Sequence, residues 1–281
     1  MSQVIRVAHS PDSDDAFMFY GLATGAIDTE DLEFVHELQD IETLNRRALK
    51  GELEVTAVSI HAYAYLSSRY ALLPHGASMG EGYGPRIVAR DALAPRELAG
   101  RVVAIPGTMT SAFLALRMYQ PEALHEVVPF DRILEHVAAG RAEAGLIIHE
   151  GQLTWRDHGL HLVADLGEWW AAETGGLPLP LGGNVIRRDL GAPLIARVSR
   201  MLRASIAYGL EHRASALAHA AQYGRDLEPA QIDEFVGMYV NQRTLDYGED
   251  GRRAVQLFLD RGYESGLIPQ RVDVDFVDDT P

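Results

Sequence analysis

The alternation of short apolar runs with helix-forming segments is the strongest constraint on the fold of this chain. Up to residue 74, runs typical of strands (4–9, 32–38, 55–59 and 70–74) alternate with helical segments (16–24, 41–50 and 60–69). The same alternation resumes between residues 101 and 165. Strands and helices in this order favour a mostly parallel sheet with helices on both faces, so the fold class predicted is α/β.

Two extended stretches, near residues 84–90 and 180–188, enclose the second of these α/β blocks. The tract Ser78–Gly84, with three glycines, is expected to be a flexible hinge or to lie close to a ligand. We interpret the two stretches as out-and-back connections between two lobes that face each other across a cleft. Residues 1–89 and 183–281 are predicted to form a discontinuous first lobe, and residues 90–182 an inserted second lobe. From residue 193 onward the pattern is helical.

Charge and composition restrict the possible partners. The 281-residue chain has a formal net charge of -15 and contains no cysteine. Nucleic acids and anionic membranes attract clustered Lys and Arg, so we expect neither as a partner. Thiolate catalysis, disulfides and cysteine-based metal sites are excluded. No apolar run reaches the roughly 18 residues of a membrane span, and no signal-peptide pattern precedes the first strand. We expect a cytoplasmic protein that acts on a small molecule.

The segment Arg141–Glu150 places a histidine at the end of a strand. The apolar run Ala144–Ile148 is typical of a buried parallel strand, and it stops at His149. Ligands of open α/β sheets bind at the carboxyl ends of strands, where an imidazole can exchange a proton near neutral pH. His149 is therefore a candidate general base. The alternative is a histidine that only hydrogen-bonds to a backbone carbonyl.

The segment Ile105–Ser111 combines a strand end, a tight turn and a helix start. Backbone N–H groups at a helix start bind anions, and the hydroxyls of Thr110 and Ser111 add donors. The spacing lacks the Lys and the second Gly of a P-loop, which argues against a nucleoside triphosphate. We expect a carboxylate or a polyol to bind here. The alternative is that these hydroxyls only cap the helix.

Polar residues also follow two strands of the first block. Ser59 ends the run 55–59 and is expected either to face the cleft or to cap the next helix. Asp12, Asp14 and Asp15 follow the run 4–9 at a helix start. Carboxylates in this position usually cap the helix and interact with its dipole. We expect no metal site here, because the pattern lacks further ligands such as a His-x-x-x-His pair.

Taken together, seven short segments resemble one known family. They are Ser10–Tyr20, Asp40–Asn45, Val58–Ser59 with Ala62–Ala64, Gly82–Pro85, Pro106–Gly107 with Thr110–Ser111, Gly145–Glu150 and Leu177–Gly182. In this order they resemble the 1,4-dihydroxy-6-naphthoate synthases of the futalosine route to menaquinone. The resemblance runs from residue 4 to about residue 250. The chain departs from it at Asp12-Ser13-Asp14, where the family more often shows Cys-Pro-Asn.

The resemblance implies a two-lobed, periplasmic-binding-protein-like fold of type II and a lyase that uses no cofactor and no metal. Its substrate would be cyclic dehypoxanthine futalosine, and its products 1,4-dihydroxy-6-naphthoate and a sugar-derived fragment. His149 falls where the family has its proposed general base. The positions that match cleft-facing residues of the family are Asp15, Asn45, Ser59, Thr110 and Ser111.

Two other functions are compatible with the same pattern. Chorismate dehydratase, a related branch, shares the fold and the pathway. A non-catalytic solute-binding protein also shares the fold, because a fold does not fix a function. A binding protein that serves a transporter normally carries an export signal or a lipidated cysteine, and this sequence shows neither. We therefore expect the enzyme.

Overall fold

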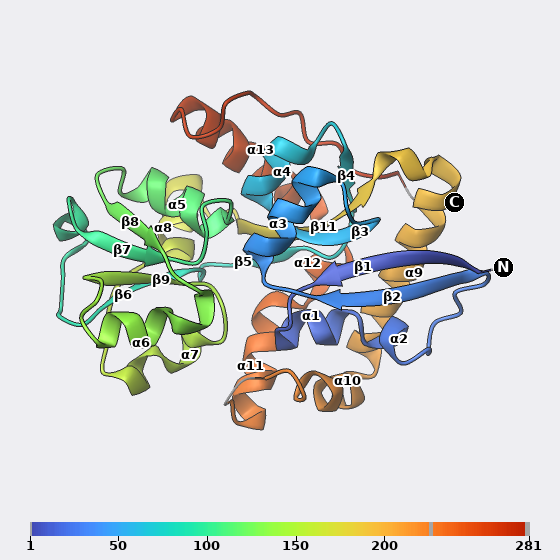
Figure 1. The fold of residues 1–281 in the computed structure, drawn as a ribbon, viewed down its shortest axis with the longest axis horizontal. Coiled ribbons are helices and arrows are strands. Elements are labelled where there is room, and N and C mark those ends of the chain that lie inside the picture. The colour runs from blue at the N-terminus through green and yellow to red at the C-terminus, as the bar shows by residue number, and fades with distance from the viewer. Residues whose placement is uncertain (1, 225–226, 279–281) are drawn as a thin grey trace.

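Two separate β-sheets organise the protein, as Figure 1 shows for the computed structural model, which describes residues 2–224 and 227–278. The first sheet has the strand order β2-β1-β3-β11-β4, with β5 paired to β11. Its strands are β1 (Gln3–His9), β2 (Leu32–Leu38), β3 (Val55–Ser59), β4 (Tyr70–Leu72), β5 (Ser78–Gly80) and β11 (Leu179–Arg187). The second sheet has the order β10-β6-β9-β7-β8. Its strands are β6 (Arg86–Ala89), β7 (Val102–Ile105), β8 (Leu124–Val127), β9 (Ala144–Ile147) and β10 (His161–Asp165). We call the parts built on these sheets the first and the second lobe.

One strand in each sheet runs against the others. In the first sheet β1 is parallel to β2 and β3, whereas β11 is antiparallel to β3, β4 and β5. In the second sheet β7 is parallel to β8 and β9, whereas β6 is antiparallel to β9 and β10. The two reversed strands are the two extended stretches expected to connect the lobes. All other strands of each sheet point the same way, as predicted. Because each reversed strand lies inside its sheet, however, five of the nine pairings are antiparallel, so the prediction of mostly parallel sheets holds for strand direction and not for pairing.

The connecting strands pair with one lobe each. β6 belongs to the second sheet, and β11 pairs along its length with strands of the first. The predicted boundaries would assign β6 to the first lobe and cut β11 at residue 182. The sequence indicates two extended stretches between the lobes, but it does not show with which sheet such a stretch pairs. The precise boundaries of the lobes stay a prediction.

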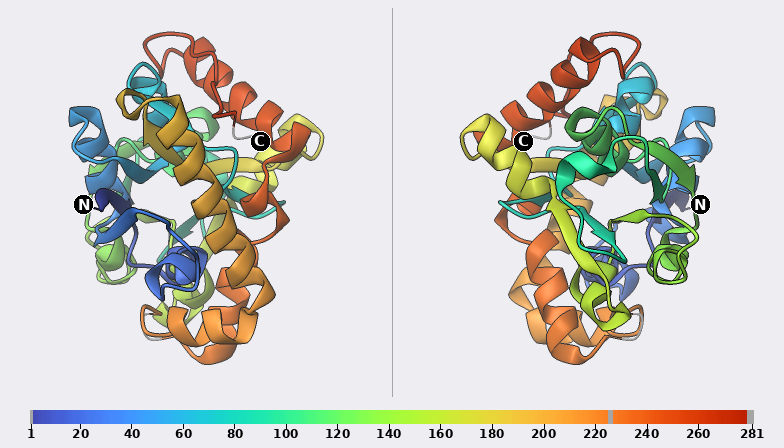
Figure 2. Two further views of the ribbon diagram at one scale, coloured as in Figure 1. Left: turned by 90° about the vertical axis from the view of Figure 1, so that its right-hand side faces the viewer. Right: turned by 90° about the vertical axis from the view of Figure 1, so that its left-hand side faces the viewer.

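Helices cover both sheets. Those of the first lobe and the C-terminal region are α1 (Ser13–Met18), α2 (Tyr20–Ala23), α3 (Ile41–Lys50), α4 (Ile60–Leu66), α9 (Ala192–Glu211), α10 (Arg213–Ala220), α11 (Pro229–Tyr239), α12 (Gln242–Leu245) and α13 (Gly248–Glu264). The second lobe carries α5 (Ser111–Tyr119), α6 (Ile133–Ala138), α7 (Gly151–Thr154) and α8 (Leu166–Thr174). Figure 2 shows the long helix α9 crossing the first lobe. None of the described helices is long and apolar enough to cross a lipid bilayer.

Helix α3 illustrates how the sequence sets an element that carries site residues. The Asp40 carboxylate accepts a hydrogen bond from the Thr43 N–H at 3.0 Å, which caps the helix start. Gly51 ends the helix with φ of 73°, a left-handed conformation that favours glycine. The buried face presents Leu44 and Ala48 to the first lobe. Both ends of α3 were predicted correctly, and the helix directs its first turn toward the second lobe.

Apolar packing joins the lobes on one side of the cleft. A single cluster of buried side chains includes Tyr63 from α4, Leu114 from α5 and Trp170 from α8. Trp170 also packs edge-on against Phe258 of α13, with ring centroids 5.4 Å apart. Where the chain enters β6, a Cβ added to Gly84 would lie 2.9 Å from the backbone nitrogen of Gly167. The backbones therefore touch at the predicted hinge, where only glycine fits.

Candidate functional site

A cavity of about 790 Å³, counting the space open to solvent, lies where the carboxyl ends of several strands meet. Ser10 follows β1, Ser59 ends β3, and Ile148 follows β9. The first turn of α5, the middle of β11 and the end of α11 complete the lining. Both lobes contribute to it. This is the position at which open α/β sheets bind ligands.

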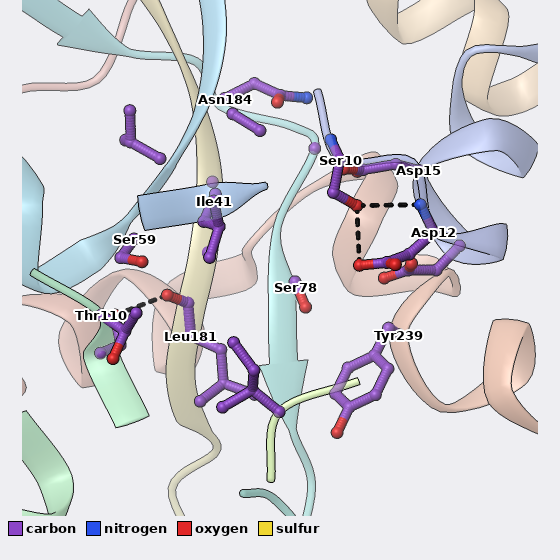
Figure 3. Close-up of a pocket in the computed structure, with 18 of the residues that line it drawn as sticks. Ser10, Asp12, Asp15, Ile41, Ser59, Ser78, Thr110, Leu181, Asn184 and Tyr239 are labelled. Atoms are coloured by element: carbon purple, nitrogen blue, oxygen red, sulfur yellow. Dashed lines mark hydrogen bonds between the residues drawn. The ribbon is translucent and has the colours of Figure 1, made fainter. Parts of the chain in front are cut away.

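The turn after β1 forms one side of the cavity, to the right in Figure 3. The Ser10 N–H donates to the Asp15 carboxylate at 2.7 Å, and the Ser10 hydroxyl donates to the Asp12 carboxylate at 3.0 Å. Burial raises the pKa of Asp15 to about 6, although the hydrogen bonds from Ser10 oppose this shift. Asp15 therefore lines the cavity, and its contact with a substrate stays a prediction.

Ser59 and Asn45 form a hydrogen-bonded pair on the opposite side, where Figure 3 shows Ser59 near Thr110. The Asn45 amide donates to the Ser59 hydroxyl at 3.1 Å, and the Ser59 N–H donates to the Asn45 carbonyl oxygen at 2.9 Å. Ser59 precedes α4 but makes no side-chain capping bond to it. Of the two alternatives for Ser59, the structure supports the cavity. Asn45 is fully buried behind Ser59 and is not among the lining residues.

Thr110 and Ser111 line the cavity at the start of α5, and protein groups already engage both hydroxyls. The Thr110 hydroxyl donates to the Gly107 carbonyl at 3.0 Å and accepts from the Phe113 N–H at 3.1 Å, which caps the helix. The Ser111 hydroxyl donates to the Leu181 carbonyl at 2.5 Å and accepts from the His61 N–H at 3.1 Å. Substrate contacts for these hydroxyls stay a prediction, with a remaining lone pair on each oxygen available to a donor.

The loop before α5 holds an anion that comes from the chain itself. The Glu42 carboxylate, on the first turn of α3, accepts a hydrogen bond from the Met109 N–H at 3.0 Å. A Cβ added to Gly107 would lie 2.3 Å from the same carboxylate oxygen, so only glycine leaves room for it. The sequence indicated that this turn binds a carboxylate or a polyol, and binding of such a ligand stays a prediction. It did not indicate that Glu42 would supply that carboxylate.

His149 lies beside the cavity and is not among its lining residues, although its neighbour Ile148 is. One ring nitrogen, Nε2, is 2.8 Å from the Phe130 carbonyl, and the Gly151 N–H donates to Nδ1 at 2.9 Å. These contacts define the tautomer with the proton on Nε2. The imidazole also packs edge-on against the Phe130 ring, with centroids 5.1 Å apart. In this arrangement His149 hydrogen-bonds to a backbone carbonyl, which is the alternative to a catalytic role. Its role as the general base stays a prediction.

Several lining residues were not singled out from the sequence as site residues. They are Ser10, Asp12, Asp14, Ile41, Ser78, Leu181, Asn184 and Tyr239. Ser10 and Asp12 lie in the turn after β1 and Asp14 lies in the first turn of α1, and this position after a strand could have marked all three. Asn184 and Tyr239 come from β11 and α11, far along the chain, and no local pattern connects them with the turn. Among the described residues, no group of three or more His, Asp or Glu side chains is placed to hold a metal ion.

Comparison with known proteins places this geometry in a class. A crystal structure of a protein from Archaeoglobus fulgidus superimposes with a TM-score of 0.90 at 44% identity, covering 94% of this chain and 98% of that one. The alkanesulfonate-binding protein SsuA from Xanthomonas axonopodis pv. citri, solved with MOPS bound, matches with a TM-score of 0.70 at 15% identity and 98% coverage of both chains. The second likeness concerns the fold alone. The fold class is periplasmic-binding-protein-like α/β, as expected.

Sequence relatives identify the family. The family model described as menaquinone biosynthesis matches residues 5–264. Two curated relatives are named 1,4-dihydroxy-6-naphthoate synthase. The one from Thermus thermophilus is 43% identical over 266 residues, covering 94% of this chain and 96% of the relative. The one from Streptomyces coelicolor is 37% identical over 277 residues, with 95% and 96% coverage. The chain belongs to the menaquinone-biosynthesis family, and the expectation of an enzyme is confirmed.

Proposed function

We propose that this enzyme converts cyclic dehypoxanthine futalosine to 1,4-dihydroxy-6-naphthoate. The observation that carries the proposal is the similarity, over 94–95% of the chain, to two relatives named for that product, combined with a cavity at the strand ends. The binding proteins of the same fold are only 10–15% identical to the chain, which is the level at which fold says nothing of function.

The proposed reaction requires few catalytic groups from the protein. A base removes one proton from the cyclic substrate, the carbon–carbon framework then fragments, and the ring becomes aromatic. Aromatisation supplies the driving force, so one base and a cavity that excludes water suffice. Asp15, Ser59, Thr110 and Ser111 would contact the substrate, and Asn45 would hold Ser59 in place. No cofactor or metal enters the proposed reaction.

His149 is the base in this proposal, and it must move in order to act. Its Nδ1 lone pair is engaged by the Gly151 N–H and its Nε2 by the Phe130 carbonyl. Because Ile148 already lines the cavity, a rotation of the next side chain would bring the imidazole to the substrate. We propose that substrate binding exchanges these two backbone contacts for a contact with the substrate.

Incubation of the purified protein with cyclic dehypoxanthine futalosine tests the proposal directly. We expect 1,4-dihydroxy-6-naphthoate to form without added metal or cofactor, and chromatography detects the product. Chorismate is the matched control substrate, because the related dehydratase would consume it. Consumption of chorismate alone would assign the chain to that branch. Tight binding of the futalosine derivative without turnover would make the chain a binding protein.

The composition of the chain also bears on the partner of the enzyme. The net charge of -15 supports a small molecule rather than a nucleic acid as the partner. We propose that the reaction takes place in the cytoplasm. Fractionation of cells that express the chain, with the activity assayed in each fraction, tests the location.

A further inference from the structure

Asn184 occupies a position of the first sheet at which an apolar side chain would be expected. It lies in the middle of β11, which is flanked by β3 and β4, and it is only 1% exposed. Side chains two residues apart share one face of a strand. Ile186, two residues further on, lies with Met18 in a cluster of buried apolar side chains. The sheet therefore turns a carboxamide toward an apolar layer, although asparagine is unfavourable in strands.

The main chain of β11 does not require this side chain. Asn184 pairs with Ala57 of β3, and its backbone carbonyl accepts a hydrogen bond from the Leu73 N–H at 2.8 Å. These backbone bonds are open to any residue that suits a strand. Burying an amide that lacks partners costs free energy, so a carboxamide at a core position indicates a use outside the sheet.

The hydrogen-bonding capacity of the Asn184 side chain is almost unused. A carboxamide offers two N–H donors and an oxygen that accepts. Among the described residues its one hydrogen bond runs from Nδ2 to the Met18 sulfur at 3.4 Å, and a thioether is a weak acceptor. No described donor bonds to the side-chain oxygen, and this oxygen is nevertheless not enclosed by protein. It therefore borders the cavity that Asn184 lines (Figure 3).

Gly76 makes room for this amide. Gly76 has φ of 77°, a left-handed conformation, and it also lines the cavity. A Cβ added to Gly76 would lie 2.2 Å from Asn184 Nδ2 and 2.9 Å from its Cγ, so only glycine leaves the amide undisturbed. The Gly76 N–H donates to the Thr244 carbonyl at 2.7 Å, which fixes the turn. Met18 and Gly76 thus hold the nitrogen side of the amide, and its oxygen is left for the cavity.

We propose that Asn184 is a specificity-determining residue whose side-chain oxygen accepts a hydrogen bond from a hydroxyl of the sugar-derived part of the substrate. The inference rests on the proposed function, since it concerns the binding of that substrate. A hydroxyl can donate to the amide oxygen and still accept from another donor. A compound that places an apolar group here would bury the amide oxygen without a partner, which disfavours that compound.

Asn184→Leu tests the proposal, because leucine is similar in size and removes the amide. KM for cyclic dehypoxanthine futalosine should rise by roughly 5- to 100-fold, the range for a buried hydroxyl that loses its acceptor, while kcat changes little. The free energy of unfolding should stay the same or increase, because an apolar side chain then faces the apolar layer around Met18. Asn184→Ala, which is too small to clash with Gly76, should show the same rise in KM. An unchanged KM in either folded variant overturns the proposal.

The reaction product supplies a matched control ligand. The product 1,4-dihydroxy-6-naphthoate lacks the sugar-derived part, so calorimetric titration should give the same affinity for wild type and Asn184→Leu. A loss of product affinity as large as the rise in KM would assign the contact to the ring part of the substrate, and that result overturns the proposal.

Calorimetry with cyclic dehypoxanthine futalosine itself separates this inference from the proposed function. If wild type binds the compound without turnover, and binds it more tightly than Asn184→Leu does, the proposed function fails and the contact stands. Turnover by wild type with the same KM in both proteins overturns the contact alone. Absence of binding to wild type overturns both.

Discussion

The Glu42 carboxylate of the first lobe accepts a hydrogen bond from the Met109 N–H of the second lobe, at 3.0 Å. The Glu42 side chain is only 12% exposed, and its other oxygen pairs with Arg46 at 2.6 Å. A hydrogen bond to a partly buried charge contributes more than a neutral one. This contact therefore fixes the loop before α5 against α3, on the side of the cavity that Ser59 and Thr110 line.

Removing this contact should destabilise the protein. We expect Glu42→Ala to lower the free energy of unfolding by about 1–3 kcal/mol, because it leaves the Met109 N–H without its acceptor. Glu42→Gln should cost less, since its side-chain carbonyl can still accept from Met109 while the pair with Arg46 is lost. Denaturant unfolding of both variants measures the difference. Equal costs would mean that the Arg46 pair, and not the contact between the lobes, carries the stabilisation.

Replacement of Thr110 separates its capping role from substrate binding. Thr110→Val removes the hydroxyl that links the Gly107 carbonyl and the Phe113 N–H. We expect a loss of about 1 kcal/mol in unfolding free energy, the usual cost of a lost helix cap. Thr110→Ser keeps the hydroxyl and serves as the control. Calorimetric titration with the reaction product shows whether affinity also falls by roughly 3- to 10-fold, as a ligand contact requires. Weaker binding with unaltered stability would assign the hydroxyl to the ligand alone.

Loss of the imidazole should abolish most of the turnover. In His149→Asn we expect turnover to fall by about 100-fold or more, within the range for loss of a general base. Substrate affinity should change little, because Asn is of similar size and can still hydrogen-bond where the imidazole would contact the substrate. Steady-state assays measure turnover, and circular dichroism of the same variant shows whether it is folded, so the two together separate a chemical defect from a folding defect. A variant that turns over at a near-normal rate would exclude His149 as the base and direct attention to Asp15.

Some elements close to the site were predicted well, whereas others, and the contacts between elements, were not. The helix predicted at 16–24 is instead two short helices, α1 (Ser13–Met18) and α2 (Tyr20–Ala23). β2, α3 and β3 have the predicted ends, because their apolar patterns, cap and glycine stop are local signals. β5 and α8 were not predicted. β5 is a three-residue strand in a glycine-containing tract that exists only because β11 lies beside it, and α8 has glycine in its first turn. These elements depend on tertiary neighbours rather than on their own residues.

At the site, too, the positions of residues were predicted better than the contacts between them. Strand ends and helix starts can be recognised from the sequence. The sequence therefore indicated Asp15, Ser59, Thr110 and Ser111, which all line the cavity. It did not show that the His149 ring faces the Phe130 carbonyl, since that depends on a side-chain rotation and on a distant loop. Nor did it show the raised pKa of Asp14, which arises from burial and from charges on both lobes.

Acid should destabilise the first lobe through a pair of histidines, of which His9 is buried and His36 half-buried. His9 stacks on Phe19 with ring centroids 4.4 Å apart, and its Nε2 is 3.2 Å from His36 Nδ1. Burial lowers the pKa of His9 and of His36 to about 4. In the unfolded chain both would titrate near 6.5, so the unfolded state takes up protons first as the pH falls. Stability is fully present above about pH 6.5 and is lost down to about pH 4, by roughly 3 kcal/mol for His9.

Comparison of variants isolates this contribution from those of other groups. The free energy of unfolding of His9→Gln should depend less steeply on pH between about 6.5 and 4 than that of wild type. His158→Gln, which changes an exposed histidine, should keep the wild-type slope. Parallel pH profiles for His9→Gln and wild type would show that His9 does not take up a proton on unfolding.

The position of β11 imposes an order on the folding of the newly made chain. It lies between β3 and β4 in the first sheet, yet β4 ends at Leu72 and β11 begins only at Leu179. During synthesis the strands of the second sheet, which ends at Asp165, all emerge before this central strand. The second lobe can thus close on itself as a unit, while the first waits with the edges of β3 and β4 unpaired. The second lobe can therefore fold before β11 has been synthesised, whereas the sheet of the first lobe is completed only afterwards.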